Sequence, residues 1–448
     1  MSAAPLVGHS HHDDILAWQD GAIVTRAQFL SQVVGLAASL PDHATVINLS
    51  EHRYRFLVGF AAALLRGQTT LLPPGRSPKA LNQLAHSYPD SYCLTDGTEA
   101  VDGLACHPLR VDDVPTATPP DIPQIPLDQK AVVAFTSGST GQPRPNVKTW
   151  RALIAVATRT AARLGLKASD RMHVVATVPH QHMYGLEASI MLPLTHGWAF
   201  HSSRPLFPED VRAALAEVPE RRILVTTPLH IRACMIAQLP LPTLEIMLSA
   251  TAPLAPAMAQ QAELAFQTKV HEIYGFAEAG SVAMRHTVTD ALWQVLDGIS
   301  LHQSADSCYL SASYLKEAVA FPDVVTPQGA DKFQLHGRGT DLVNIGGHRA
   351  SLSDLNQILN DIEGVEDGVF FLSDDHGTAN ARIVAFVVAP QTSVEQILRE
   401  LRASVDPVFL PRPLCLVPSL PRNATGKLTR ESLMGLVQQY CPRNDNDR

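Results

Sequence analysis

The chain has 448 residues, of which 46% are hydrophobic and 17% are charged, and its formal net charge is −8. This length exceeds what one compact core accommodates, so two or three structural units are expected. The acidic balance argues against a protein that coats nucleic acid, because such proteins need a basic face.

The expected compartment follows from apolar runs and cysteines. The longest apolar run, FLVGFAAALL (residues 56–65), is too short to cross a bilayer, so no membrane span is expected. The first residues, MSAAPLVGHSHHDD, do not resemble a signal peptide, because no basic start precedes an apolar stretch. The 6 cysteines are scattered without a CxxC pair, which is typical of reduced thiols. A cytoplasmic protein is predicted.

Helical and β-type patterns alternate through the first three quarters of the chain. AQFLSQVVGLAASL (27–40) has helical spacing, whereas ATVINLS (44–50) and TTLLPP (69–74) are β-prone. Further strands are predicted at AVVAF (131–135), RMHVVATV (171–178), RILVTT (222–227), LEIMLSA (244–250) and KVHEIYG (269–275). Helices are predicted between them, at 149–165 and 208–218 for example. This alternation favours a mostly parallel sheet covered on both faces.

The pattern changes after about Gly339. Helical LSDLNQILNDI (352–362) and VEQILRELRAS (394–404) alternate with β-prone GVFFL (368–372) and RIVAFVVA (382–389), enough for a small unit. The prediction is an α/β fold. A large multi-sheet α/β domain covers residues 1–339, and a small α+β domain covers residues 340–448.

One segment, AFTSGSTGQPRP (134–145), gathers glycines and hydroxyls directly after a predicted strand. Such a composition is usual in flexible linkers, but it also suits a loop that wraps phosphates with N–H groups and hydroxyls. Neither the Walker pattern nor GxGxxG is present. The composition alone leaves both interpretations open.

This segment resembles the phosphate loop TSGSTGxPK of the AMP-forming adenylate ligases, which include acyl- and aryl-CoA ligases, peptide-synthetase adenylation domains and luciferases. Further segments resemble that superfamily's other motifs, in its order. They are VPHQHMYG (178–185), LSATAPL (248–254), YGFAE (274–278), FPDVV (321–325), HGRGTDLVNIGGHR (336–349) and LPRNATGKLTR (420–430). So many motifs in the same order make chance agreement implausible.

The resemblance implies roles for the matching residues. The phosphate loop would hold the departing pyrophosphate of ATP through Thr136, Ser137, Gly138, Ser139, Thr140, Gly141 and Arg144. The rest of the nucleotide site would comprise Thr251 and Ala252 beside adenine and acyl group, Tyr274 at adenine with Gly275 next to it, and Ala277 where relatives have a threonine that touches the α-phosphate. Asp323 would hold the ribose hydroxyls, and Arg338 and Gly347 would lie at the hinge and its following loop.

Three residues would carry the chemistry. His182 would line the pocket for the acid, Glu278 would bind Mg²⁺, which prefers carboxylate oxygens, and Lys427 would bridge the carboxylate and the α-phosphate. Taken singly, His182 is more often a structural histidine and Lys427 a solvated side chain. It is the set of motifs that favours the catalytic interpretation.

The implied reaction has two steps. The acid first attacks the α-phosphorus of ATP to give acyl-AMP, and a thiol then displaces AMP. In relatives the small C-terminal domain rotates between the steps, so a mobile domain is expected here, with its pivot at Gly339-Thr340.

Four residues depart from the superfamily's pattern. Arg144 stands for lysine, Ala277 for threonine, Thr340 for the hinge aspartate and Asn344 for a loop lysine. These changes bear on efficiency more than on reaction class, because Glu278 and Lys427 remain.

The sequence therefore predicts an acid–thiol ligase that uses ATP and Mg²⁺. Its acid is expected to be aromatic or short, and its acceptor is either CoA or the phosphopantetheine arm of an acyl carrier protein. Two rivals stay open: a catalytically impaired nucleotide- or acyl-binding protein of the same fold, suggested by Ala277 and Asn344, and a kinase or other NTPase, disfavoured by the missing Walker pattern.

Overall fold

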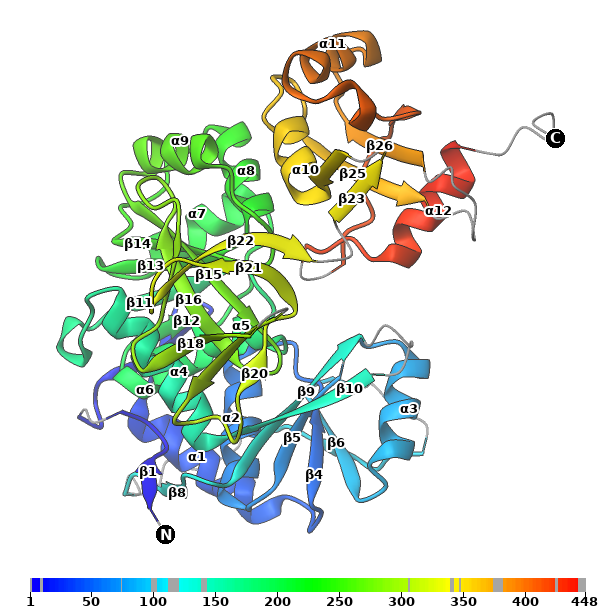
Figure 1. The fold of residues 1–448 in the computed structure, drawn as a ribbon. Coiled ribbons are helices and arrows are strands. Elements are labelled where there is room, and N and C mark those ends of the chain that lie inside the picture. The colour runs from blue at the N-terminus through cyan, green and yellow to red at the C-terminus, as the bar shows by residue number, and fades with distance from the viewer. Residues whose placement is uncertain are drawn as a thin grey trace.

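Two large sheets form the N-terminal part of the chain, and a three-stranded sheet with its own helices forms the C-terminal part (Figure 1). The computed structural model describes residues 2–8, 11–73, 75–97, 103–111, 121–137, 143–304, 307–338, 342–345, 348–373, 382–423 and 426–441.

The first sheet has the strand order β10-β9-β5-β4-β6-β7. Its strands are β4 (Thr45–Asn48), β5 (Thr69–Leu72), β6 (Ser91–Thr95), β7 (Cys106–Pro108), β9 (Lys130–Ser137) and β10 (Pro143–Thr149). All neighbours are parallel except β10, which returns antiparallel along β9. The edge position of β10 explains why it tolerates Pro143 and Pro145, which cannot donate to a second neighbour.

The second sheet has a parallel centre and antiparallel flanks. The parallel strands, in spatial order, are β2 (Ile15–Gln19), β12 (Ala199–His201), β11 (His173–Ala176), β13 (Arg222–Thr226), β14 (Ile246–Ser249) and β15 (Lys269–Phe276). The antiparallel strands are β16 (Gly280–His286), β17 (Trp293–Val295), β22 (Lys332–Arg338) and β21 (Asp323–Pro327) on one side and β3 (Ala22–Thr25) on the other. In this sheet the expected parallel arrangement is thus found only among the central strands. After β15 the turn at 277–279 reverses the chain, so that β16 runs antiparallel to β15.

Helices cover these sheets, including those expected at 27–40, 149–165 and 208–218. They are α1 (Arg26–Ser39), α2 (Arg53–Leu65), α3 (Pro78–Ser87), α4 (Trp150–Arg163), α5 (Met183–Leu186), α6 (Leu192–His196), α7 (Pro208–Glu217), α8 (Pro228–Ala237) and α9 (Pro256–Phe266). Helix α2 contains the apolar run FLVGFAAALL, and nearly every residue of that run is buried. A turn of π-helix, Glu187–Met191, joins α5 to α6. No helix within the described residues is long and apolar enough to cross a membrane.

The C-terminal part has cores of its own. Its elements are β23 (Leu342–Ile345), β24 (His348–Ser351), α10 (Leu352–Asn360), β25 (Asp367–Ser373), β26 (Arg382–Val388), α11 (Val394–Ser404), β27 (Leu414–Leu416) and α12 (Arg430–Tyr440). Two hydrophobic clusters there draw only on residues between Val343 and Cys441. The boundary at 339/340 stays a prediction, because residues 339–341 lie outside the described ranges.

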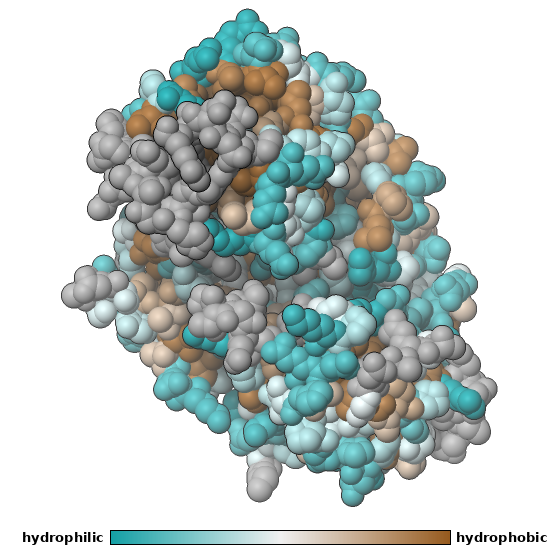
Figure 2. Space-filling view, turned by 90° about the vertical axis from the view of Figure 1, so that its right-hand side faces the viewer, coloured by the Kyte–Doolittle hydropathy of each residue, from teal (hydrophilic) through white to brown (hydrophobic). Residues whose placement is uncertain are grey.

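Two further features bear on the sequence predictions. All 6 cysteines are free thiols, and Cys415 Sγ lies 3.4 Å from Cys441 Sγ. Figure 2 views the side that carries the C-terminal part above and the β10-edged sheet below, with hydrophilic and hydrophobic side chains interspersed across it.

Candidate active site

The predicted site residues gather at one edge of the second sheet. Pro179 and His182 follow β11, Thr251 follows β14, and Tyr274 and Glu278 lie at the end of β15. Since these strands are parallel neighbours, their carboxyl ends open on the same side, which is where open α/β sheets bind ligands. Segments far apart in the sequence are thus joined by sheet topology.

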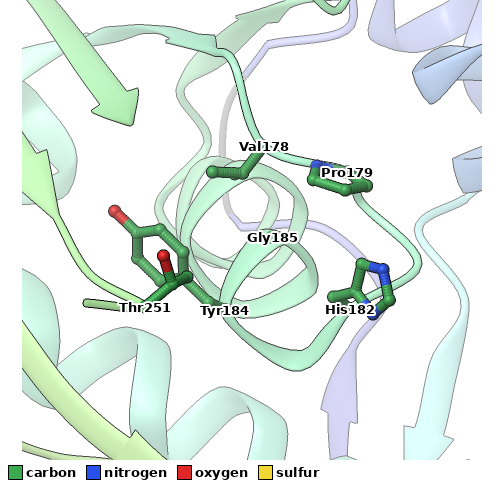
Figure 3. A pocket seen from close by; sticks show the side chains of 6 residues that line it. All are labelled: Val178, Pro179, His182, Tyr184, Gly185 and Thr251. Atoms are coloured by element: carbon green, nitrogen blue, oxygen red, sulfur yellow. The ribbon is translucent and has the colours of Figure 1, made fainter. Parts of the chain in front are cut away.

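The turn after β11 is held in place by buried groups. The Arg53 guanidinium on α2 donates to the carbonyls of Ala176 (2.9 Å) and Val178 (3.2 Å). Gly185 lets α5 approach closely, since a Cβ there would lie 1.9 Å from the Pro179 carbonyl oxygen. The position of His182 at the start of α5 is therefore fixed by packing (Figure 3).

The two histidines of this turn differ in environment. His180 is buried, packs on the Phe56 ring and bonds the Ser50 carbonyl through Nε2 (3.1 Å), so it is the structural histidine. His182 instead lines a small cavity with Val178 and Thr251. Sequence alone could not decide between a structural and a site role for His182; its position beside a cavity favours the site role, which stays a prediction.

His182 is held neutral. Burial, followed by the positive charges of Lys427 and Arg204, lowers its pKa to about 4. An uncharged imidazole can accept or donate a hydrogen bond to an acid at neutral pH, but it does not supply a cation. The charge of Lys427, which belongs to the C-terminal part, therefore already acts on this wall.

The cavity wall is rigid on the side opposite His182. The Tyr184 hydroxyl donates to the carbonyls of Leu248 (2.9 Å) and Thr226 (3.2 Å), which fixes its ring beside Thr251 (Figure 3). The space between these residues is about 10 Å³, close to the volume that one water molecule needs.

Thr251 has an unusual backbone conformation. Its φ of 80° lies in the left-handed region, which β-branched residues avoid. Glycine is the residue that adopts this conformation without strain. Thr251 thus places a hydroxyl and a methyl group in the pocket at a cost in backbone strain.

The nucleoside side of the site is built around Tyr274. Its ring stacks on Phe321 (centroids 6.2 Å apart) within an aromatic cluster, and its hydroxyl donates to Asp323 Oδ2 at 2.6 Å. Asp323 is half-buried and lies directly opposite Arg338 in the β21–β22 pair. Tyr274 therefore orients Asp323, and the contacts of both residues with a nucleoside stay predictions.

Glu278 lies in the turn between β15 and β16. Its side chain is exposed, and no hydrogen bond or ion pair joins its carboxylate to another described residue. Within the described ranges no three His, Cys, Asp or Glu side chains form a metal cluster. One available carboxylate suits Mg²⁺, which is commonly held by one or two carboxylates together with substrate phosphates and water.

The predicted phosphate loop is described only at its two ends. Thr136 and Ser137 end β9, and Arg144 is exposed on β10 opposite Thr136. Gly138, Ser139, Thr140 and Gly141 lie outside the described residues, as do Thr340 and Gly347. Ala252, Gly275 and Ala277 lie at the same sheet edge as Thr251 and Tyr274.

Lys427 lies on a braced loop. Arg422 forms a two-bonded pair with Asp367 (2.7 and 2.6 Å) and donates to the Gly426 carbonyl at 2.7 Å. The Lys427 N–H bonds Asn423 Oδ1 at 2.9 Å, and Gly426 takes a φ of 78°. The motif predicts Lys427, but Arg422 and Asp367 were missed, because their pairing depends on tertiary structure.

The C-terminal part touches the large part through Arg232 on α8. Its guanidinium donates to Asn360 Oδ1 (3.1 Å) and to the Glu366 carbonyl (2.6 Å). Burial is the main cause that lowers the pKa of Arg232. This contact helps hold Lys427 on the side of the molecule where His182 lies.

Two buried charged residues were also missed, Lys148 on β10 and Glu187 on the π-helical turn. Burial lowers the pKa of Lys148 to about 8 and raises the pKa of Glu187. The signal was a charged residue inside an otherwise apolar segment, such as the glutamate in MYGLEASIMLPL (183–194).

Comparisons with known proteins agree with this geometry. The sequence profile of the AMP-binding enzyme family matches residues 16–301. The 4-coumarate–CoA ligase of Rhodobacter capsulatus is 27% identical over 271 residues, which are 60% of this chain and 66% of that protein. The 4-coumarate–CoA ligase of Halorhodospira halophila is 27% identical over 300 residues, covering 65% and 73%. The structure of the anthranilate–CoA ligase AuaEII with anthranoyl-AMP superimposes with a TM-score of 0.79 at 15% identity, covering 96% and 95%. The fold predicted from the sequence is therefore confirmed, and the chain belongs to the AMP-binding enzyme family.

Proposed function

We propose that this chain is an AMP-forming ligase that activates a carboxylic acid with ATP and transfers the acyl group to a thiol. The observation that carries the proposal is the gathering of His182, Thr251 and Glu278 at the carboxyl ends of neighbouring parallel strands, in a chain of the AMP-binding enzyme family. The charge of Lys427 also lowers the pKa of His182, after burial as the main cause. A cation on the C-terminal part acts on the wall of a cavity at the carboxyl edge of the sheet. That is the arrangement needed for a lysine that joins a carboxylate to the α-phosphate.

In the first step, an oxygen of the acid attacks the α-phosphorus of ATP, the bond to the β-phosphate oxygen breaks, and pyrophosphate leaves. Neutral His182 and Thr251 would position the acid, Lys427 would offset charge on the attacking and α-phosphate oxygens, and Asp323 would hold the ribose. Mg²⁺ at Glu278 would neutralise phosphate oxygens.

In the second step, the sulfur of the acceptor attacks the acyl carbon. The thiol proton goes to solvent, the acyl–oxygen bond breaks and AMP leaves. The acceptor is either CoA or the phosphopantetheine arm of an acyl carrier protein, and both present the same thiol.

We propose an aromatic or short acid as substrate. Both curated relatives described above are named for 4-coumarate, an aromatic acid. The wall of Pro179, His182 and Tyr184 offers rings but little apolar length. A long fatty chain has no comparable groove among these lining residues.

The test is a panel of acids in ATP–pyrophosphate exchange, with the nucleotide product identified. AMP is expected with a benzoate, a cinnamate or a short acid, and thioester formation is then compared with CoA and with carrier protein. ADP as product would indicate a kinase or other NTPase. ATP binding without exchange for any acid would indicate the catalytically impaired alternative. Better activation of palmitate than of any aromatic acid would overturn the substrate class.

A further inference from the structure

A buried lysine and a buried glutamate lie behind the turn that carries Glu278. Lys148 is 4% exposed and Glu187 is 5% exposed. Neither side chain can reach a substrate from there, and the proposed reaction assigns neither of them a task. Their contacts all lead to the turn at 277–279 and the strand that follows it.

Lys148 is tied to the middle of this turn. Its Nζ donates to the main-chain carbonyl oxygen of Glu278 at 2.6 Å. Along β10, Lys148 lies on the same face as Arg144, since side chains four residues apart on a strand share a face. The strand that leaves the predicted phosphate loop is thereby bonded to the residue expected to hold Mg²⁺.

Glu187 is tied to the end of the turn. Its Oε2 accepts bonds from the Ser281 N–H (3.0 Å) and the Ser281 hydroxyl (2.6 Å). Gly280 leaves space for this carboxylate, because a Cβ there would lie 2.5 Å from Glu187 Oε1. Glu187 also follows the His182 turn by one helical segment, so the cluster links three of the predicted motifs.

Stability of the fold does not account for these two charges. Removing an ammonium and a carboxylate from water costs several kcal/mol each, and well-packed apolar residues in place of a buried pair are often as stable or more stable. A methionine would fill the space of Lys148 without that penalty. The carbonyl bond to Glu278 is what methionine could not provide.

We propose that Lys148 and Glu187 are positioning residues that hold the 277–279 turn, and with it the Glu278 carboxylate, against strand β10 for a metal–nucleotide complex. The proposal rests on the proposed function, because it takes Glu278 as the metal ligand. Partners behind a ligand commonly change metal affinity by about ten- to a hundredfold when they are removed.

The experiment measures ATP binding by titration calorimetry with Mg²⁺ and again with EDTA, together with Mn²⁺ binding by electron paramagnetic resonance. Lys148→Met is expected to lower the metal-dependent gain in ATP affinity about tenfold and to leave the affinity in EDTA within about twofold. The matched control is Lys130→Met, an exposed lysine on the neighbouring strand β9, which should change neither value.

A double variant separates positioning from general damage. Glu278→Gln should remove the metal-dependent gain, and Lys148→Met added to it should cause no further loss, because both act through one carboxylate. Losses that multiply, or a Lys148→Met variant that binds Mg²⁺–ATP like the wild type, would overturn the proposal. Equal losses with Mg²⁺ and EDTA, accompanied by a lower unfolding temperature, would also overturn it.

A milder variant keeps the test decisive if Lys148→Met does not fold. Ser281→Ala removes one bond to Glu187 and should lower the metal-dependent gain about threefold; no change would count against the proposal. Failure of the proposed function has a different signature. In that case the wild type forms no AMP, or Glu278→Gln leaves metal-dependent binding intact, whereas failure of this inference alone leaves the Glu278→Gln effect in place.

Discussion

Two lysines are proposed to serve the same edge of the second sheet, and the two parts of the chain hold them in opposite ways. Lys148 is buried in the large part and bonded to the Glu278 carbonyl. Lys427 is exposed on a loop whose bracing groups, Arg422 and Asp367, both belong to the C-terminal part. A lysine buried in the large part, such as Lys148, suits a role that is the same in both steps of the proposed reaction. A lysine on the separate C-terminal core, such as Lys427, can act in adenylation and be moved away during thioester formation.

The sharpest way to break this comparison is Lys427→Ala. Formation of acyl-AMP should fall by about a hundred- to a thousandfold or more, because the charge on the attacking and α-phosphate oxygens loses its partner. The same variant, given prepared acyl-AMP and the thiol, should form thioester at close to the normal rate. Equal damage to both steps would return Lys427 to a general binding role.

Glu278→Gln tests the carboxylate on the turn that Lys148 bonds in the large part. It keeps the shape of the side chain and removes its charge, so adenylation should fall about a hundredfold when measured by pyrophosphate exchange. Ala277→Thr, which restores the superfamily's residue next to it, serves as control and should be neutral or mildly activating. Nearly full exchange by Glu278→Gln would mean that other groups hold the metal.

Loss of the Arg232 contact between the two parts of the chain should slow the reaction less than loss of the Lys427 or the Glu278 charge. Arg232→Met removes the bonds to Asn360 and Glu366, so the first step should slow about fivefold while thioester formation from acyl-AMP stays unchanged. Arg212→Met, an exposed arginine on α7, is the matched control and should change neither step. A loss in the second step alone would mean that this contact belongs to the other arrangement of the parts.

The smallest effect is expected from Thr251→Gly. Relief of strain at φ 80° should raise the free energy of unfolding by about 1 kcal/mol in a urea titration, after the greater freedom of glycine in the unfolded chain is offset. Ala250→Gly has no such strain to relieve and should lower it by about 0.5–1 kcal/mol. If both variants are destabilised alike, the Thr251 conformation is not strained.

The sequence predicts elements well where the spacing of apolar residues is regular. The expected helix at 394–404 is α11 with the same bounds, and the strand expected at 131–135 lies within β9. Strand β10 was missed, since two prolines argue against a strand unless its edge position is known. The antiparallel turn at 277–279 was missed because local sequence does not fix the direction of the next strand.

The candidate site likewise contains residues that the sequence predicts and residues that it does not. Motifs predict His182, Glu278 and Lys427, because their roles depend on residue type at a fixed place in a family. Lys148 and Glu187 bond main-chain atoms of another segment, and Arg422 pairs with the Asp367 side chain, so these partners become visible only when the chain is folded.

The brace around Lys427 has a consequence for turnover. Arg422 and Asn423 fix the loop through bonds made within the C-terminal part, with no contribution from a substrate. The conformational entropy of that loop is therefore lost once, when residues 343–441 fold, and not again each time an acid and a nucleotide arrive. Every catalytic cycle then begins with the main chain at Lys427 already placed, and only the side-chain rotamer of Lys427 and the placement of the C-terminal part on the large part remain to be selected.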